Sequence, residues 1–248
     1  MIILKTPQEI SKMREGNRIL ALLFKHLDPM IQPGVTTAEL DQEAELFILS
    51  HNAVPAFKGY RGYPATLCTS VNEQVIHGIP GPRRLKTGDI VSIDVGALHD
   101  GFYSDASRTY AVGEVSKKAL HLMEVTERAL YEGIGQAVAG NRLYDISAAI
   151  QKVVESAGFF VVREFVGHGI GRTLHEDPQI PNFGKKGSGP VLQEGMTFAI
   201  EPMVNEGTWK VNILKDGWTA VTADGSLSAH FEHSIAITAN GPLILSIL

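Results

Sequence analysis

One segment constrains the fold of this chain most strongly: DIVSIDVGALHDGFYSDASRTYAV, residues 89–112. It alternates in strand fashion on both sides of Asp100-Gly101, a dipeptide typical of tight β-turns, and therefore predicts a β-hairpin. Counting outward from that turn places Asp94 and Asp105 as diagonal neighbours on one face of the hairpin. Their backbones are then roughly 7 to 8 Å apart, so the two carboxylates can converge on a shared point.

No basic side chain of the hairpin shares that face, because the alternation turns Arg108 to the other side. Two like charges that face one space raise each other's pKa or require a cation, and Asp is uncommon in the middle of strands. The hairpin therefore favours a metal site. A solvated sheet face is the alternative that the hairpin alone leaves open.

Four helices are predicted, and two of them begin with a capping box, in which a threonine is followed three residues later by a glutamate. These are Thr6 with Glu9 and Thr36 with Glu39, and Asp28-Pro29 ends the first helix. The predicted helices cover residues 7–28, 37 to about 50, a stretch that starts near 116, and about 143–158.

The two parts of the chain resemble each other. GDIVSID at 88–94 and GMTFAIE at 195–201 both begin with glycine and place isoleucine before a carboxylate, which makes Asp94 and Glu201 counterparts. Each part also has two helices joined by a turn with a glycine, Gly34 or Gly140. No linker separates the parts, so we expect one domain over 1–248 with pseudo-symmetric halves of about 1–112 and 113–248.

Further candidate ligands lie in strand-like runs of the second half. His168 is bracketed by glycines in FVGHGIGRTLHEDP, Glu201 lies in MTFAIEPMV, and Glu232 lies in LSAHFEHSIAIT. Together with Asp94 and Asp105 they form an oxygen-rich set with one imidazole, which suits two divalent ions such as Mn, Fe, Co or Zn. Such a set accepts several metals, so the sequence leaves the identity of the ions open.

Seven residues in their motifs make the chain resemble the type I methionine aminopeptidases: His77 in NEQVIHGIP, Asp94 in SIDVG, Asp105 in YSDASRT, His168 and His175 in GHGIGRTLHEDP, Glu201 in AIEPMV, and Glu232 in HFEHS. The resemblance covers essentially the whole chain with ordered spacings. It implies the α+β pita-bread fold, with two pseudo-symmetric halves and a curved antiparallel sheet covered by helices.

The resemblance also implies roles for these residues. Asp105, His168, Glu201 and Glu232 would hold one ion, and Asp94, Asp105 and Glu232 the second. Glu201 would also serve as a proton shuttle, while His77 and His175 would position the scissile amide and stabilise the tetrahedral intermediate. The implied reaction is hydrolysis that removes the initiator methionine from nascent proteins whose second residue is small.

A methionine pocket is implied around Tyr60, Tyr63, Cys68, Leu174 and Trp218, together with His77 and His175. Leu174 and Phe57 depart from the family, since many bacterial relatives have phenylalanine at the first position and some have cysteine at the second. Cys68 could instead be a small buried apolar residue and Trp218 a core residue. Asn72 and Ser228 match positions near a monovalent cation site in related enzymes.

Two other functions compete with this one. An X-Pro aminopeptidase or prolidase shares the fold and the metal ligands, but such enzymes usually carry a large additional N-terminal domain, and here the hairpin already begins at residue 89. A non-catalytic peptide-binding relative typically loses metal ligands, whereas all five are present.

Composition predicts the setting. The chain has 22 basic and 27 acidic residues, a net charge of −5, one cysteine, and no apolar run long enough to span a membrane. We expect a cytoplasmic protein with no membrane anchor and no direct nucleic-acid readout, and the family suggests a monomer. The short basic clusters at 83–86 and 185–186 are expected to be solvated surface, and transient contact with the ribosome through them is a further hypothesis.

Overall fold

The computed structural model describes residues 1–248 and contains the four predicted helices. Both capping boxes form: the Thr6 hydroxyl accepts a hydrogen bond from the Glu9 N–H at 3.2 Å, and the Thr36 hydroxyl accepts one from the Glu39 N–H at 3.1 Å. The predicted helix positions are confirmed. The helices are α1 (Pro7–Leu27), α2 (Thr37–Ser50), α3 (Lys117–Gly135) and α4 (Leu143–Ser156), and the short 3₁₀ helices are η1 (Asp28–Met30) and η2 (Tyr60–Gly62).

One large curved sheet of nine strands dominates the fold, and every strand pair in it is antiparallel. Its order is β1 (Val54–Pro55), β4 (Ile90–His99), β5 (Phe102–Ala111), β14 (Glu232–Thr238), β9 (Thr197–Ile200), β7 (Gly167–Gly169) and β8 (Glu176–Ile180), with β2 (Leu67–Val71) on β4 and β15 (Gly241–Ile244) on β14. Two small sheets contain β13 (Ser228–His230), β10 (Met203–Asn205) and β6 (Phe160–Val161), and β11 (Val211–Ile213), β12 (Ala220–Thr222) and β3 (Gln74–Ile76).

The hairpin β4–β5 has the predicted register. His99 pairs with Phe102, and Asp94 pairs with Ser107. The turn residues Asp100 and Gly101 have φ values of 48° and 79°, which is the left-handed conformation that two-residue hairpin turns need.

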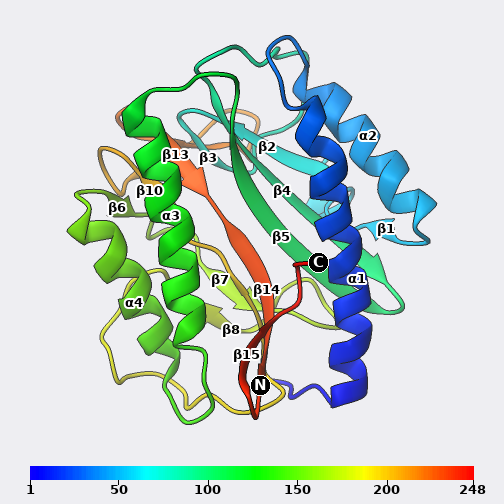
Figure 1. The fold of residues 1–248 in the computed structure, drawn as a ribbon, viewed down its shortest axis with the longest axis vertical. Helices are drawn as coiled ribbons and strands as arrows, with labels where there is room; N and C mark the ends of the chain where they lie inside the picture. The colour runs from blue at the N-terminus through cyan, green and yellow to red at the C-terminus, as the bar shows by residue number, and fades with distance from the viewer.

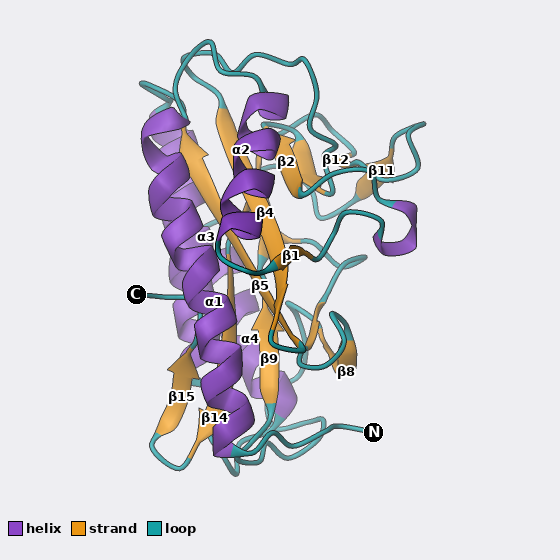
Figure 2. Cartoon of the chain, turned by 90° about the vertical axis from the view of Figure 1, so that its right-hand side faces the viewer, coloured by secondary structure: helices purple, strands orange, loops and turns teal.

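Helices cover one face of the sheet. Figure 1 shows α1 and α2 over β4 and β5, and α3 and α4 on the other side of β14; in Figure 2, β8, β11 and β12 lie on the opposite side of the sheet from α1 and α3. Val91, Ile93 and Val95 of β4 pack with α1 and α2 in one apolar cluster, and the Arg108 guanidinium lies 4.9 Å from the centre of the Phe24 ring on the same side. The alternate positions of β4, Asp94 among them, therefore face away from the helices.

Matched features recur in the two parts of the chain. Gly88 before β4 and Gly195 before β9 have φ values of 97° and 88°, and Gly34 and Gly140 in the two interhelical turns have values of 101° and 93°. Each helix pair covers its own apolar cluster. The predicted α+β architecture with a curved antiparallel sheet is confirmed, and the matched glycines support our proposal that 1–248 is one domain with two similar halves.

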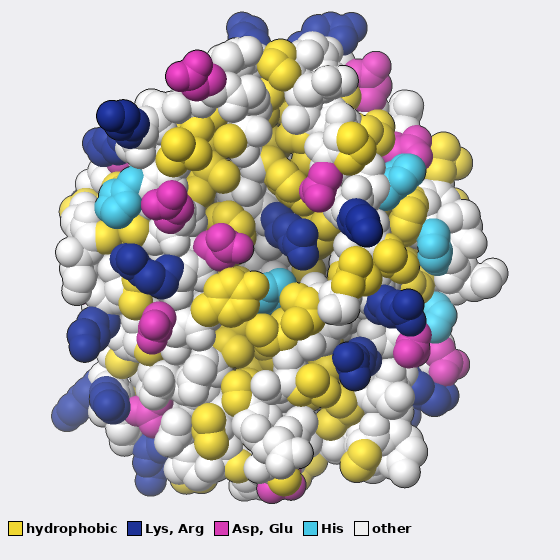
Figure 3. All heavy atoms as spheres, in the orientation of Figure 1, with side chains coloured by type: hydrophobic (Ala, Val, Ile, Leu, Met, Phe, Trp, Pro, Cys, Tyr) yellow, Lys and Arg dark blue, Asp and Glu magenta, His cyan; other side chains and the backbone are white.

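The helix-bearing surface has no single-sign charge. Figure 3 shows Lys and Arg side chains interspersed with Asp and Glu over this face. The basic residues Arg83, Arg84, Lys185 and Lys186 are exposed, as predicted for solvated surface. None of the helices is long and apolar enough to pass through a lipid bilayer.

Candidate metal centre and its pocket

A cavity of about 150 Å³ lies against the sheet face that the helices leave free. Fourteen residues line it. Twelve are the candidates from the sequence: Asp94, Asp105, His168, Glu201, Glu232, His77, His175, Tyr60, Tyr63, Cys68, Leu174 and Trp218; the other two are Phe57 and Arg61. The structure thus brings together residues from the strands β2, β4, β5, β7 and β14, from η2, and from the loops between elements.

Strand register explains how the acids meet. Asp94 on β4 lies opposite Ser107 on β5, which in turn lies opposite Glu232 on β14. The Ser234 hydroxyl on β14 donates to the Asp105 carbonyl oxygen at 2.7 Å and accepts from the Asp105 N–H at 3.2 Å. These two hydrogen bonds hold Asp105 on β5 and Ser234 on β14 in a second row beside the first. These two rows place Asp94, Asp105 and Glu232 on one face of three adjacent strands.

The second half of the chain supplies the imidazole. His168 on β7 pairs with Ala199 on β9, just before Glu201. One ligand atom from each of Asp105, His168 and Glu232 lies within 4.8 Å of the other two. His168 Nε2 is also 3.5 Å from Glu201 Oε1 and 3.8 Å from Asp105 Oδ2.

The acids lack positive partners. No lysine or arginine lies within ion-pair distance of the four carboxylates. The basic groups within that distance are the imidazoles of His168 and His230. Oδ1 of Asp94, Oδ1 of Asp105 and Oε1 of Glu232 are buried without a hydrogen-bond partner. Buried anionic oxygens without partners are strongly unfavourable unless a cation binds them, so the residues present fit a divalent metal.

Protonation behaviour agrees with this fit. Burial raises the pKa of Asp94 to about 7, and burial together with the other carboxylates raises the pKa of Asp105, Glu201 and Glu232 well above their usual values. Burial, with a further effect of His175, lowers the pKa of His168 to about 3, so its imidazole is neutral. Its Nδ1 lies 2.8 Å from the Gly169 carbonyl oxygen and donates to it, which leaves the Nε2 lone pair directed at the acids.

Two further histidines flank the acids. The backbone of His77 is left-handed, with φ 59°, and is held against β2 by a 2.7 Å hydrogen bond from the Thr69 N–H to the Gly78 carbonyl oxygen. His175 lies at the mouth of the pocket, where its Nδ1 is 2.9 Å from the Tyr60 hydroxyl. Burial, then the neighbouring His175, lowers the pKa of His77 to about 4, and burial, then Arg61, lowers the pKa of His175. Neutral imidazoles of this kind can each donate one N–H.

The pocket walls are mostly apolar. Tyr63 is buried, donates to the carbonyl oxygens of Leu67 and Gly78 at 2.9 and 3.0 Å, and meets Trp218 edge to face with ring centres 5.1 Å apart. Cys68 is buried opposite Asp94 on the neighbouring strand, and burial raises the pKa of its thiol, so it stays protonated. Cys68 is therefore both a buried apolar residue and a wall of the cavity, and Trp218 lines the cavity although it also packs on Tyr63.

Two residues of the site, Arg61 and His230, escaped the sequence reasoning as functional candidates, whereas Phe57 was noted there as a departure from the family. Phe57 and Arg61 line the cavity, and Arg61 has a left-handed φ of 50° between Gly59 and Gly62. His230 is 1% exposed, and its Nε2 lies 3.7 Å from Glu201 Oε2 without a hydrogen-bond partner. The two glycines of KGYRGY predict an irregular turn, but the sequence pattern does not predict that this turn packs beside the acids.

Asn72 and Ser228, the residues expected near a monovalent cation, are hydrogen-bonded to each other, and neither lines the pocket. The Ser228 N–H donates to the Asn72 carbonyl oxygen at 2.9 Å, and the Ser228 hydroxyl donates to the Asn205 side chain at 2.8 Å. The side-chain NH₂ of Asn72 donates a hydrogen bond to Asp89 Oδ1, and its Oδ1 accepts one from the Ile90 N–H. Cation binding here stays a prediction.

Comparison with known proteins is informative over the whole chain. The sequence model described as metallopeptidase family M24 matches residues 11–239. A Clostridium perfringens protein described as methionine aminopeptidase is 56% identical over 248 residues, which is 100% of both chains. This family match and the acid–histidine cluster together support the use of divalent metal.

Solved structures agree in fold. The crystal structure of methionine aminopeptidase from Thermotoga maritima has a TM-score of 0.98 and 50% identity, with 100% of both chains covered. An Xaa-Pro dipeptidase from Bacillus anthracis has a TM-score of 0.77 and 25% identity; the match covers 98% of this chain but only 61% of that one.

Proposed function

The chain belongs to metallopeptidase family M24, and from this premise we propose that it is a metal-dependent methionine aminopeptidase that removes the initiator methionine from proteins with a small second residue. The observation that carries the proposal is the convergence of four largely buried acids and one neutral imidazole, from both halves of the chain, on one apolar-walled pocket. The full-length identity to relatives of that description supports the choice of substrate.

We propose that the site holds two divalent ions, with Asp105 and Glu232 shared between them. Asp105, His168, Glu201 and Glu232 would bind one ion, and Asp94, Asp105 and Glu232 the other. Four carboxylates carry more negative charge than a single dication neutralises, which supports the count. Bound there, the ions would lower the pKa of a water molecule toward neutrality and so supply a nucleophile for amide hydrolysis.

The chain's own residues would perform the remaining steps. Glu201 would take the proton of the attacking water and deliver it to the leaving amine, a role open to a carboxylate that lines the same pocket. His77 and His175 would each donate an N–H to the substrate and stabilise the oxyanion as it develops. The pocket bounded by Tyr63 and Cys68 would exclude water and select an unbranched thioether side chain, which aromatic walls favour.

A paired peptide assay tests this function. Protein reconstituted with Mn, Fe, Co or Zn is given a Met-Gly peptide and an Ala-Pro peptide, with and without chelator. We expect cleavage of Met-Gly that chelator abolishes and added metal restores. Preference for Ala-Pro would transfer the assignment to an X-Pro aminopeptidase. Cleavage of neither peptide would favour a non-catalytic binding protein.

The setting of the enzyme is also a proposal. We expect a cytoplasmic monomer that meets nascent chains, with the exposed pairs Arg83-Arg84 and Lys185-Lys186 available for transient ribosome contact. Co-sedimentation with ribosomes at low salt should weaken when Lys185 and Lys186 are both changed to Glu. Absence of co-sedimentation by the unaltered protein would remove this part of the proposal.

A further inference from the structure

The N-terminal segment, residues 1–6, precedes α1 and has no regular structure, yet it contains a buried charge. The side chain of Lys5 is 3% exposed and forms an ion pair with Glu176, whose side chain is 7% exposed. A buried ion pair is strongly unfavourable when only one partner remains, so the geometry of both partners is tightly coupled. Lys5 and Glu176 are 171 positions apart in the chain.

Lys5 is fixed along its whole length. Its backbone N–H donates to the Gly195 carbonyl oxygen at 2.7 Å, in the turn just before β9. Its Nζ donates to the Ile3 carbonyl oxygen at 3.2 Å as well as to Glu176 Oε2. The ammonium group therefore reaches Glu176 from a backbone that the main sheet holds in place.

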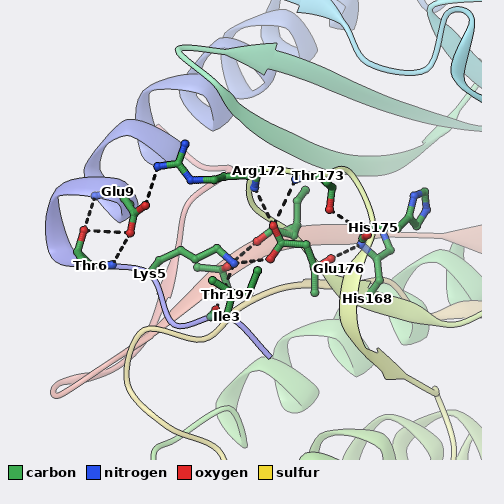
Figure 4. A network of polar contacts seen from close by, with 12 residues as sticks. Ile3, Lys5, Thr6, Glu9, His168, Arg172, Thr173, His175, Glu176 and Thr197 are labelled. Atoms are coloured by element: carbon green, nitrogen blue, oxygen red, sulfur yellow. Dashed lines mark hydrogen bonds and ion pairs between the residues drawn. The ribbon is translucent and has the colours of Figure 1, made fainter. Parts of the chain in front are cut away.

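Glu176 uses its second oxygen to close a turn. Oε1 accepts hydrogen bonds from the N–H groups of Arg172 and Thr173, at 2.7 and 3.3 Å. The Thr173 hydroxyl donates to the His175 carbonyl oxygen at 3.1 Å. Figure 4 shows Lys5 and the turn meeting at this one carboxylate, with the rings of His175 and His168 beyond it.

The third glycine of the GHGIG motif makes room for the pair. A Cβ on Gly171 would lie 2.3 Å from Cε of Lys5 and 2.7 Å from Oε1 of Glu176. The Gly171 carbonyl oxygen accepts from the Tyr103 N–H at 2.8 Å, which ties the start of the turn to β5. The ion pair therefore occupies space that exists only because residue 171 has no side chain.

The turn held in this way carries two pocket residues. Leu174 is buried in the pocket wall, and His175 lies at its mouth with its ring 4.2 Å from the His168 ring. Only the Tyr60 hydroxyl contacts the His175 ring by a hydrogen bond. The position of the imidazole consequently depends on the backbone of residues 171–176.

We propose that the Lys5–Glu176 ion pair positions His175 for catalysis by fixing the turn 171–176 against the N-terminal segment. This inference rests on the proposed function for its catalytic part, since His175 acts on the substrate only there. Lys5 and Glu176 are positioning residues: neither lines the pocket.

The test compares Lys5→Met with Lys12→Met. Lys12 also forms a lysine–carboxylate pair, with Asp100 at 2.7 Å, but its side chain is 51% exposed and it lies outside the pocket, so it is the matched control. A displaced His175 should weaken stabilisation of the transition state rather than substrate binding. We expect kcat on a Met-Gly peptide to fall about 10- to 100-fold in Lys5→Met with KM nearly unchanged, and Lys12→Met to match the unaltered enzyme.

A double variant separates positioning from general damage to the fold. In a His175→Ala background, Lys5→Met should lower kcat by less than about twofold, because the group it positions is already gone. An equal loss in both backgrounds would overturn the proposal. Should Lys5→Met fail to fold, Glu176→Gln keeps the shape of the side chain and removes the charge, and the same pattern is expected.

Hydrogen–deuterium exchange gives a readout that does not depend on activity. The N–H groups of Arg172 and Thr173 are bonded only through Glu176, so a peptide spanning 171–177 should exchange faster in Lys5→Met and not in Lys12→Met. Unchanged exchange would overturn the proposal even if the protein proved inactive on methionyl peptides. Inactivity of the unaltered enzyme would instead refute the proposed function. The exchange result would then decide whether the Lys5–Glu176 ion pair fixes the turn 171–176.

Discussion

Asp105 is one of the two acids proposed to be shared between the metal ions. Its backbone is fixed to the Ser234 hydroxyl through both N–H and carbonyl oxygen, and its side chain is nearly buried. Oδ1 nevertheless has no hydrogen-bond partner. Since its backbone is already fixed by these hydrogen bonds, the Asp105 carboxylate is preorganised to bind a cation.

Replacement of Asp105 by Ala should therefore abolish metal uptake and turnover together. A ligand shared by two ions matters more than an outer contact, whose loss typically costs 10- to 100-fold, so we expect kcat/KM to fall by more than about 100-fold. Metal content by elemental analysis and hydrolysis of a Met-Gly peptide check this. Asp100→Asn, which keeps the left-handed turn of the same hairpin, is the control; retained metal with full turnover in Asp105→Ala would contradict the shared role.

His77 should contribute to turnover without contributing to metal binding. His77→Asn suits the test, since asparagine tolerates the left-handed backbone found there. We expect kcat to fall about 100-fold with metal content unchanged, as for loss of an oxyanion donor. His121→Asn on α3 is the control. A loss of metal in His77→Asn would place this histidine among the ligands instead.

Single residues also mark the limit of sequence reasoning. The acids could be found because each is an exception in a strand-like run. His230 could not, because it lies in a three-residue strand beside a second histidine, His233, and alternation over so short a run does not tell which ring faces the acids. Lys5 could not either, since its only distinguishing feature is a partner 171 positions away in the chain.

At the scale of elements, local signals determined what could be predicted. The turn at Asp100-Gly101 fixed the register of β4 and β5, and capping residues fixed the starts of α1 and α2. Strand-like runs are recognisable around β7 and β13, but with three residues each these strands are too short for the sequence to predict their bounds or partners. They form because β9 and β10 supply partners, which is a property of the whole fold.

The capping box of α2 should be measurable in stability and invisible in activity. Thr36→Ala removes the bond from the Glu39 N–H, and loss of such a cap costs about 1 kcal/mol. For a chain of this size that corresponds to a fall in Tm of about 2 to 4 °C. Ser11→Ala, at an exposed position inside α1, is the control and should leave Tm unchanged or slightly higher. A Tm equal to that of the unaltered protein would mean that α2 does not depend on its cap.

At the scale of the molecule, the acid cluster links stability to metal and pH. Without metal, the folded protein holds carboxyls whose pKa is raised, to about 7 for Asp94 and well above the usual value for Asp105, Glu201 and Glu232. A group whose pKa is higher in the folded state stabilises the fold at pH values below its unfolded-state pKa. This stabilisation is lost as pH rises through its folded-state pKa. The buried histidines act in the opposite sense, but only below their unfolded pKa of about 6.5.

Chelated protein should consequently lose stability as pH rises through about 7, the folded-state pKa of Asp94, which lies above the range in which the histidines act. Metal at 100 times its Kd should restore about 2.7 kcal/mol, or about 5 to 10 °C in Tm, and flatten the pH dependence. Thermal unfolding followed by circular dichroism measures both. A chelated Tm that stays level through this rise in pH, or equals that of the metal-loaded protein, would contradict the account of the cluster.

The five proposed ligands are spread over the chain so that the last of them, Glu232, lies on β14, which joins β5 to β9 near the end of the sequence. A polypeptide still emerging during synthesis, or cut short by a premature stop, would lack this acid and the central strand that seats the others. The proposed catalytic site is thus complete only once almost all of this sequence has been made, so an incomplete chain could not attack its neighbours.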